Sequence, residues 1–267
     1  MITKEIKKII PDNIKKALLR LIYRERKINL SGTHSLSECI CCGSSSIITA
    51  PILWEKLIQD WQLSEYETDY INRQQGVYCQ RCKVNLRGMA IAYGMMRDAS
   101  FRGYFKDFVR TRKVRSRKIL EINEAAWLTQ YFNMVSGHVL GSFPEVDMQM
   151  LPYENDSFDI VVHSDTLEHV PDPLMGLREC YRVLVPGGYC VFTVPMVIDR
   201  LTRSRVGLPP SFHGSESKRT DDYIVHTEFG GDAWKLAIEA GFSEVRVYSL
   251  EYPAALCFLC VKEKNNA

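Results

Sequence analysis

The sequence has no hydrophobic run long enough to cross a membrane as a helix. Its longest uninterrupted apolar stretch runs from Pro253 to Val261, far short of the ~18 residues that a membrane-spanning helix needs. The N-terminal residues MITKEIKKII are charged throughout and lack the apolar centre and small-residue cleavage site of a secretory signal. We therefore expect a cytoplasmic protein.

A strong excess of one charge is also missing. The 267 residues carry a net charge of +2, with 46% hydrophobic and 25% charged residues, as in ordinary globular proteins. These values exclude a disordered chain, a collagen and a pure coiled coil. The charge is nevertheless uneven, because residues 1–28 hold nine Lys and Arg against three acids, and residues 102–118 hold eight against Asp107.

The two basic segments allow different interpretations. Residues 1–30 are predicted to form a basic amphipathic helical segment, which either packs on the body of the protein or lies peripherally on an anionic membrane surface at the inner membrane face. Residues 91–117 are predicted to be a helical basic linker with a solvated charged face. Interleaved aromatic residues would also suit nucleic acid, but this is the less favoured interpretation.

Two pairs of cysteines predict a metal site. Nine cysteines in a chain without an export signal indicate a reducing compartment, where paired cysteines hold metal more often than they form disulfides. Four thiolates in two C-x₂-C knuckles suit a tetrahedral, structural Zn²⁺, so residues 31–90 are predicted to be a zinc ribbon with a helical insertion around Trp54–Trp61. Cys41 is a bystander or an alternative ligand. The predicted ligands are Cys39, Cys42, Cys79 and Cys82.

The cysteines of the C-terminal half have a different setting. Cys257 and Cys260 lie within an apolar strand, where the alternation of side chains points the two thiols to opposite faces. We interpret them as core packing, and we interpret Cys180 and Cys190 in the same way.

From Lys118 onward the sequence alternates between strands and helices. Helices are predicted over residues 124–135, from an Asp172 cap with Pro173 at the first position, and from an Asp232 cap. This alternation favours an α/β domain over residues 118–267 with a mainly parallel sheet. The predicted strands are residues 118–122, 137–143, 158–164, 189–195, 243–250 and 254–262.

One segment resembles a known family. The residues from Asp147 to Asp159 read DMQMLPYENDSFD and continue as IVVHSDTLEHVPDPLMGLRECYRVLVPGGYCVFTVP. This resembles the central segment of class I S-adenosylmethionine-dependent methyltransferases of the type 11-like group, and KILEI resembles their first strand. A zinc ribbon ahead of such a domain resembles a bacterial branch of these proteins. The resemblance implies a Rossmann-like sheet and an enzyme that moves a methyl group to oxygen or nitrogen.

The resemblance also implies which residues bind the cofactor at the carboxyl ends of the strands. Glu121, at the end of the first strand, would serve the amino-acid end of S-adenosylmethionine. Asp147, which would follow the third strand of the family's sheet, would accept from the adenine amino group, and Met148 would bind adenine through its backbone and cover the ring. The other cofactor-binding residues expected at these strand ends are Asn123, Ser142 and Ser164.

Three titratable residues near the expected crevice are candidate catalytic groups. His169 is either a structural hydrogen-bonding residue or an acid/base catalyst. His226, close to the last helix, is a candidate base on the acceptor side. Asp165 is either a base or the cap of a turn.

The sequence departs from the family after the first strand and leaves two hypotheses. Residues 121–127 read EINEAAW where the family has a glycine-rich loop, and the short distance from Glu121 to Asp147 leaves no room for two full helices. The first hypothesis is a methyltransferase acting on a small molecule or a glycan, such as a cell-surface polysaccharide precursor made at the inner membrane face. The alternative is a cofactor-degenerate fold that serves as a zinc-ribbon binding module for protein or nucleic acid.

Overall fold

The computed structural model describes residues 36–212 and 223–264, which lie in one compact unit, Leu36–Ala267. The predicted basic helix of residues 1–30, and with it the expected membrane contact of residues 1–28, lies outside the described residues. The described parts of the predicted ribbon and of the predicted α/β domain belong to the same compact unit. None of the described helices is both long and apolar enough to span a lipid bilayer.

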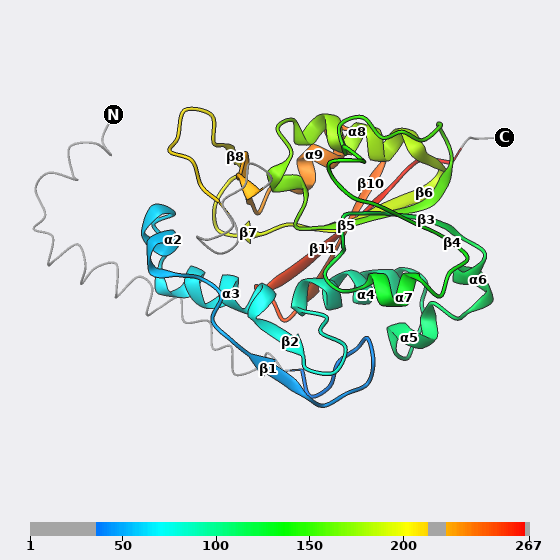
Figure 1. Ribbon diagram of the computed structural model, residues 1–267, viewed down its shortest axis with the longest axis horizontal. Coiled ribbons are helices and arrows are strands. Elements are labelled where there is room, and N and C mark those ends of the chain that lie inside the picture. The colour runs from blue at the N-terminus through cyan, green and yellow to red at the C-terminus, as the bar shows by residue number, and fades with distance from the viewer. Residues whose placement is uncertain (1–35, 213–222, 265–267) are drawn as a thin grey trace, which may run out of the picture. The chain divides into compact units, whose positions relative to one another are not determined.

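A six-stranded sheet forms the centre of this unit, in the order β10-β11-β6-β5-β3-β4 (Figure 1). Four neighbouring strands, β4, β3, β5 and β6, run parallel, whereas β11 pairs antiparallel with both β6 and β10. This arrangement confirms the predicted α/β fold with a Rossmann-like sheet. The strands are β3 (Lys118–Ile122), β4 (Gly137–Gly141), β5 (Phe158–Ser164), β6 (Leu184–Thr193), β10 (Glu244–Leu250) and β11 (Ala255–Val261).

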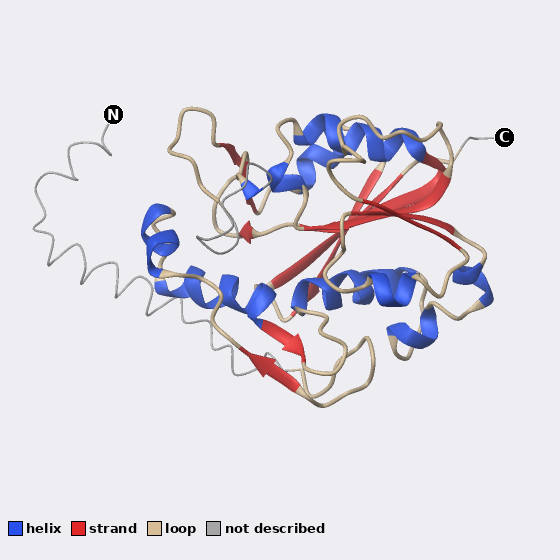
Figure 2. Ribbon diagram, viewed as in Figure 1, coloured by secondary structure: helices blue, strands red, loops and turns tan. Residues whose placement is uncertain are grey.

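Helices cover both faces of the sheet (Figure 2). On one face lie α8 and α9, and on the other α4 packs against β6, β10 and β11. Because successive side chains of a strand point to opposite faces, Ile119 joins the core on the α4 side and Leu120 joins the core on the α8 side. The helices are α4 (Leu86–Asp98), α8 (Pro173–Val183) and α9 (Trp234–Glu239).

The start of α8 follows the sequence prediction. The carboxylate of Asp172 accepts a hydrogen bond from the backbone N–H of Met175 at 3.0 Å, and Pro173 occupies the first helical position. The cap satisfies one of the backbone donors that a helix leaves unpaired at its start, and proline needs no partner there. The predicted helix start at Asp172 is confirmed.

The N-terminal part of the described chain is a small hairpin with a helical insertion. Strands β1 and β2 pair antiparallel, and α2 and α3 lie between them in the sequence. Ser64 and Glu67 form a capping box at the start of α3, each side chain bonding the other residue's backbone N–H. The elements are β1 (Ile47–Thr49), α2 (Glu55–Asp60), α3 (Glu65–Gly76) and β2 (Val77–Cys79).

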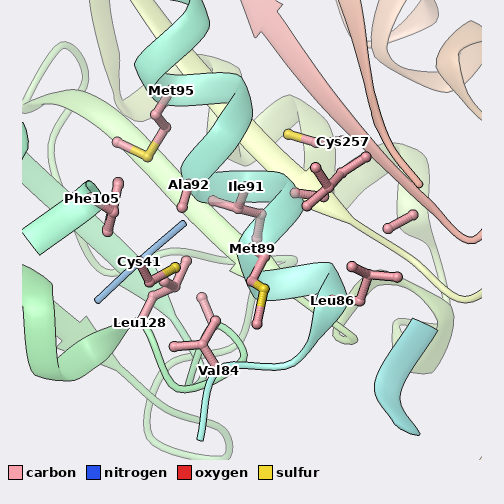
Figure 3. Close-up of a cluster of buried hydrophobic side chains, with 14 of the residues drawn as sticks. Cys41, Val84, Leu86, Met89, Ile91, Ala92, Met95, Phe105, Leu128 and Cys257 are labelled. Carbon is pink, nitrogen blue, oxygen red and sulfur yellow. The ribbon is translucent and has the colours of Figure 1, made fainter. Parts of the chain in front are cut away.

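Helix α4 joins this hairpin and the sheet through one continuous apolar core (Figure 3). Its side chains Ile91 and Met95 belong to the same buried cluster as Cys41 from the first knuckle and Cys257 from β11. Cys260 belongs to the cluster on the other side of the sheet, so the prediction that Cys257 and Cys260 face opposite ways is confirmed. Burying one large apolar side chain contributes about 1.5–3 kcal/mol.

Two helix predictions are wrong in extent. The predicted helical run over 91–117 stops where α4 ends, at Asp98, because Ser100 and Gly103 have φ values of 54° and 137° that no helix contains. Two four-residue helices follow, α5 (Phe105–Phe108) and α6 (Arg112–Arg115). The helix predicted over 124–135 shrinks to α7, Thr129–Phe132, because Ala126 and Trp127 also have positive φ.

The expected third strand ahead of Asp147 is wrong as well. The chain leaves β4 at Gly141 and reaches β5 at Phe158 through turns, with no strand between them in this described stretch. The edge of the sheet is therefore β4 itself. The last predicted helix begins later than expected, because the Asp232 carboxylate accepts from the backbone N–H of Thr202 at 2.6 Å while Ala233 takes the N-cap position of α9.

A second, small sheet lies within the long polar stretch after β6. Strand β9 pairs parallel with β7 and antiparallel with β8. It also contacts η3, a three-residue 3₁₀ turn that follows β5. These elements are η3 (Leu167–His169), β7 (Met196–Val197), β8 (Arg203–Ser204) and β9 (Thr227–Gly230).

Candidate active site and metal centre

The order of the parallel strands predicts a ligand crevice at the carboxyl ends of β3 and β5. Strand β4 lies on one side of β3, and β5, which follows β4 in the sequence, lies on the other side. Ligands of open α/β sheets bind at such a switch point, outside the carboxyl ends of the strands. The loops that follow these two strands, residues 123–128 and 165–170, therefore border the candidate site.

The loop after β3 adopts backbone conformations that are usual for glycine, although it contains none. Asn123, Ala126 and Trp127 have φ values of 55°, 51° and 67°. Asparagine tolerates this left-handed region, but for Ala and Trp it costs about 1–2 kcal/mol per residue. We call residues 123–128 the left-handed loop. The surrounding structure must hold it in this shape.

Glu121 anchors this loop from inside the protein. Its buried carboxylate accepts hydrogen bonds from the Ala125 backbone N–H at 2.8 Å, the Thr129 hydroxyl at 2.7 Å and the His138 Nε2 at 2.8 Å. Partial desolvation by the surrounding loop, and then the negative charge of Glu121, raise the pKa of Glu124 in the same segment. The structure thus shows protein groups on both oxygens of Glu121, and its contact with the cofactor stays a prediction.

The left-handed loop also rests on the N-terminal part of the chain. A Cβ built on Gly88 of α4 would lie 2.6 Å from the carbonyl oxygen of Ala126, so only glycine permits this approach. The Gln130 side-chain amide donates to the carbonyls of Cys82, at 2.8 Å, and of Trp127, at 2.7 Å. One side chain therefore ties the second cysteine knuckle to the loop.

The structure brings the four predicted zinc ligands together. The sulfur atoms of Cys39, Cys42, Cys79 and Cys82 all lie within 4.8 Å of one another, and all four residues are buried. Two of the separations, Cys39 to Cys82 and Cys42 to Cys79, are 3.6 Å. Four thiols converging at this spacing match the ligand set of a closed tetrahedral Zn²⁺ site. Cys41 is buried but outside this group.

The other predicted cofactor residues divide between the crevice and the interior. Asn123 crosses the crevice, because its Oδ1 accepts from the Phe143 backbone N–H at 3.0 Å and its amide donates to Thr166 Oγ1 at 3.3 Å. The neighbouring Ser142 is exposed. Ser164 is buried and shares a hydrogen bond of 2.8 Å with the Thr193 hydroxyl.

Asp147 and Met148 lie in the turns between β4 and β5. The Asp147 carboxylate accepts from the backbone N–H of Gln149 at 2.8 Å and remains partly exposed. The Met148 side chain is 3% exposed and packs in the core beside Gly176. Binding of adenine by these two residues stays a prediction.

The three candidate catalytic residues lie in or near η3, since His169 ends this turn and Asp165 precedes it. His169 contacts the carbonyl of Ile224 through Nδ1 at 2.8 Å, and its Nε2 lies 3.5 Å from the Glu168 carboxylate. The backbone of His226 donates to the carbonyl of Glu168 at 2.8 Å. Burial, and then the charge of His169, lower the pKa of His226. Glu168 thus contacts His169 through its side chain and His226 through its backbone.

Asp165 is held from the N-terminal part of the chain. Its carboxylate pairs with the Arg87 guanidinium of α4 at 2.7 Å and accepts from the Gln75 amide of α3 at 2.7 Å. Arg87 is almost fully buried, so the pair lies in a poorly hydrated environment. This arrangement fixes the side chain that follows β5.

Asp165, Glu168 and His169 line a pocket of about 550 Å³, whereas His226 is not among its lining residues. Its apolar wall comes from α2, α3 and the chain before them, and its floor comes from the ends of α3, α4 and β5. The volume is that of a site for a small molecule. The wall is Ile52, Leu53, Trp54, Leu57 and Ile71, and the polar floor is Gln74, Gln75, Arg87, Asp165, Glu168 and His169.

Sequence reasoning missed most of this pocket. Gln75 and Arg87 lie in the segment predicted to be a zinc ribbon, where nothing indicates that they face the end of β5. Glu168 stands beside His169 in the sequence and was available as a candidate, since a carboxylate next to a histidine is a common acid/base pair. The sequence indicates for Trp54 only a place in a helical insertion.

Comparison with known proteins adds a family and several relatives. Residues 128–192 match the model of a family described as a methyltransferase domain. A demethylmenaquinone methyltransferase of Staphylococcus aureus is 33% identical over 132 residues, which make up 45% of this chain and 55% of that protein. The chain thus spans about half the length of the curated relatives it matches.

Two of the solved structures that are similar to this chain are the following. A SAM-dependent methyltransferase from Methanosarcina mazei covers 57% of this chain and 94% of its own, at 15% identity and a TM-score of 0.37. An S-adenosylmethionine-dependent methyltransferase from Mesorhizobium loti covers 64% and 96%, at 16% identity and a TM-score of 0.37. The family match and the curated relatives support the predicted class of enzyme, a methyltransferase that depends on S-adenosylmethionine.

Proposed function

We propose that this protein transfers the methyl group of S-adenosylmethionine to a small acceptor molecule bound in the pocket beside η3. The observation that carries the proposal is the position of this pocket, at the same edge of the sheet as the left-handed loop. Asn123 of the loop and Thr166, which precedes η3, are joined by a hydrogen bond of 3.3 Å. Cofactor crevice and acceptor pocket would therefore be neighbours.

The residues around the crevice fit a cofactor with a polar, partly charged end. The left-handed loop keeps positive φ at Asn123, Ala126 and Trp127, the backbone region in which glycines let a chain approach a ligand closely. When bound, S-adenosylmethionine supplies a methyl group already activated by a sulfonium. Asn123, Ser142 and Asp147 are the residues we propose to line its site, and Glu121 would hold the loop for it.

The remaining task of the protein is to place the acceptor and remove its proton. Because the carbonyl of Ile224 can only accept a hydrogen bond, the Nδ1 of His169 carries the proton and donates to it. The other ring nitrogen, Nε2, is then the basic one. Glu168, 3.5 Å away, stabilises the imidazolium that forms when Nε2 takes a proton. Asp165, fixed by Arg87 and Gln75, would orient the acceptor by hydrogen bonding. A base placed this way contributes typically 10²–10⁴-fold to the rate.

The pocket wall favours an acceptor with an apolar body and a polar group at one end. Trp54, Leu57 and Ile71 offer an apolar surface, whereas the hydroxyl or amine to be methylated would lie near His169. The relative named for demethylmenaquinone agrees with a small-molecule acceptor. A sugar carried on a lipid, as in a polysaccharide precursor, has the same two-part character and is the form of acceptor that the basic residues 1–28 favour.

We also propose that the four clustered thiols bind one structural Zn²⁺. A site with four protein sulfurs has no open position for a substrate. The Zn²⁺ would stabilise the second cysteine knuckle. Because the Gln130 amide donates to the carbonyl of Cys82 in this knuckle, the metal would also support the left-handed loop. Residues 1–28 would add a peripheral contact with anionic lipid from the cytoplasmic side, and sedimentation with anionic vesicles, with and without these residues, tests that point.

Calorimetry with S-adenosylhomocysteine tests the function first. Binding is expected, and the absence of heat at millimolar ligand would contradict the proposal and favour a binding module. Transfer assays then compare hydroxylated apolar acceptors with sugars. His169→Gln keeps a group that can donate to Ile224 but removes the base, so kcat should fall about 10²–10⁴-fold with unchanged cofactor affinity. Unaltered kcat would exclude His169 as the base.

A further inference from the structure

A second group of metal-ligating side chains lies on the opposite side of the sheet from the cysteine knuckles. His163 of β5, Cys180 of α8 and Cys190 of β6 have one ligand atom each, and these atoms all lie within 4.8 Å of one another. All three residues are fully buried. They belong to neither the zinc knuckles nor the acceptor pocket.

The unusual member of this group is His163. Neither of its ring nitrogens has a hydrogen-bond partner among the described residues, and its ring stacks on Phe192 with centroids 4.8 Å apart. Leaving a buried polar group unpaired costs about 1–3 kcal/mol, so native proteins rarely retain one without a reason. A neutral imidazole in this position has a ring-nitrogen lone pair to offer to a metal ion.

We propose that His163, Cys180 and Cys190 form a second metal site, one that takes a soft ion and foremost Zn²⁺. Imidazole and thiolate are the ligands that such ions prefer. On binding, the two thiols would each lose a proton to solvent, and the two thiolates with a neutral imidazole would balance the charge of Zn²⁺. With these three ligands the site is electrically neutral, which a dry core tolerates. A further thiolate would release a third proton to solvent and leave one negative charge on the site.

A fourth ligand is available nearby. Cys260 of β11 is the direct cross-strand partner of Cys190 and belongs to the same core cluster beneath α8. Side chains directly opposite each other on one face have Cβ atoms about 4.5–5.5 Å apart. A change of side-chain rotamer at Cys260 would complete a tetrahedral site of three sulfurs and one nitrogen, a known structural zinc set.

The metal would brace the strand that leads into the acceptor pocket. His163 precedes Ser164 and Asp165 directly, while Cys180 and Cys190 lie in the middle of α8 and β6. One ion would thus fasten helix α8 to the two strands at the centre of the sheet.

Metal analysis of the full-length protein, purified without chelator, tests the proposal. Two zinc ions per chain are expected for the wild type. His163→Phe, which preserves the stacking on Phe192, should leave one zinc ion per chain, bound at the cysteine knuckles. Cys82→Ser should also leave one, bound at the new site. Cys180→Ala provides a second removal at the new site if His163→Phe folds poorly. One zinc together with one copper would keep the site and assign it to Cu⁺.

The direction in which His163→Phe changes the Tm distinguishes a metal site from ordinary core packing. If His163 binds metal, His163→Phe lowers both the metal content and the Tm. If no metal is there, the same substitution removes an unpaired buried polar group and raises the Tm. One metal per chain in the wild type, together with a raised Tm for His163→Phe, would overturn the proposal.

Discussion

The cysteine knuckles and the left-handed loop are adjacent in the structure but relate to sequence in opposite ways. The knuckles keep the spacing of a metal site, and their four sulfurs converge to within 4.8 Å. The loop has lost the glycines expected after the first strand, yet Asn123, Ala126 and Trp127 retain positive φ. At the knuckles, the C-x₂-C spacing is present and predicts the convergence of the four sulfurs. In the left-handed loop, the positive φ values are present although the glycines that usually accompany them are absent.

The difference shows where the constraint on each region comes from. Ligand atoms hold the knuckles, so the residue types cannot change. Neighbours hold the loop: Glu121 bonds it from inside, Gln130 ties it to Cys82, and α4 presses on Ala126. Enough such contacts can keep a strained backbone in place without glycine. The conformation of the left-handed loop would then depend on the knuckles, whereas the knuckles would not depend on the loop.

Removing the zinc ligands should produce the largest effect. Cys82→Ser is expected to abolish zinc binding at the knuckles and to lower the free energy of unfolding by about 5 kcal/mol or more, since structural zinc binding in small domains is worth ~10–16 kcal/mol. Affinity for S-adenosylhomocysteine should fall with it, because Gln130 loses an ordered partner. Zinc content, protease cleavage near Trp54 and Trp61, and calorimetry measure the three effects.

Cys41→Ser serves as the matched control for that substitution. Cys41 is equally buried in the same knuckle but lies outside the group of four sulfurs. It should keep full zinc content. A full complement of zinc in Cys82→Ser, or its loss in Cys41→Ser, would contradict the assignment of ligands.

Removing the inner anchor of the loop should have the next largest effect. Glu121→Ala leaves the Ala125 N–H, the Thr129 hydroxyl and His138 without their acceptor, and we expect a loss of about 3 kcal/mol in unfolding free energy. Glu124→Ala, at an exposed position in the same segment, should change it by less than about 0.5 kcal/mol. Urea unfolding of both variants provides the measurement, and equal effects would show that the anchor is elsewhere.

A methyl group at Gly88 should press the loop out of place. In Gly88→Ala the new Cβ would meet the Ala126 carbonyl at 2.6 Å and Val84 at 2.7 Å, a form of overpacking that costs about 1–3 kcal/mol. Gly94→Ala in the same helix meets only the Cys257 sulfur and the Tyr248 ring, at 3.0 and 3.1 Å. Both should lower stability, but only Gly88→Ala should weaken binding of S-adenosylhomocysteine. Equal affinities would mean that α4 does not support the cofactor loop.

The same contrast explains what the sequence could and could not predict. Apolar runs located the strands of the main sheet, and Asp172 with Pro173 located the start of α8, because these signals are local. The knuckle spacing located the four sulfurs. The one-turn α7 was predicted too long, because EAAWLTQYFNMV has helical propensity and the left-handed residues at its start are imposed by tertiary contacts.

The acceptor pocket could not be predicted for a related reason. Its floor joins Arg87 and Gln75 to Asp165 across a sequence separation of many tens of residues. No local signal in α3 or α4 indicates that these side chains reach the end of β5. The candidate catalytic residues after β5 were found from sequence, whereas the residues that orient Asp165 required the fold.

The smallest effect, and the sharpest test of the comparison, comes from restoring glycine to the loop. Ala126→Gly and Trp127→Gly should each relieve the left-handed strain of about 1–2 kcal/mol, reduced to a net gain of about 0.5–1 kcal/mol by the entropy that glycine loses on folding. Ala125→Gly is the control, because Ala125 does not have positive φ and is buried, so it should destabilise by about 1 kcal/mol. Urea unfolding measures all three, with cofactor affinity unchanged or improved in the first two. Destabilisation by Ala126→Gly would show that its side chain, rather than its neighbours, holds the loop.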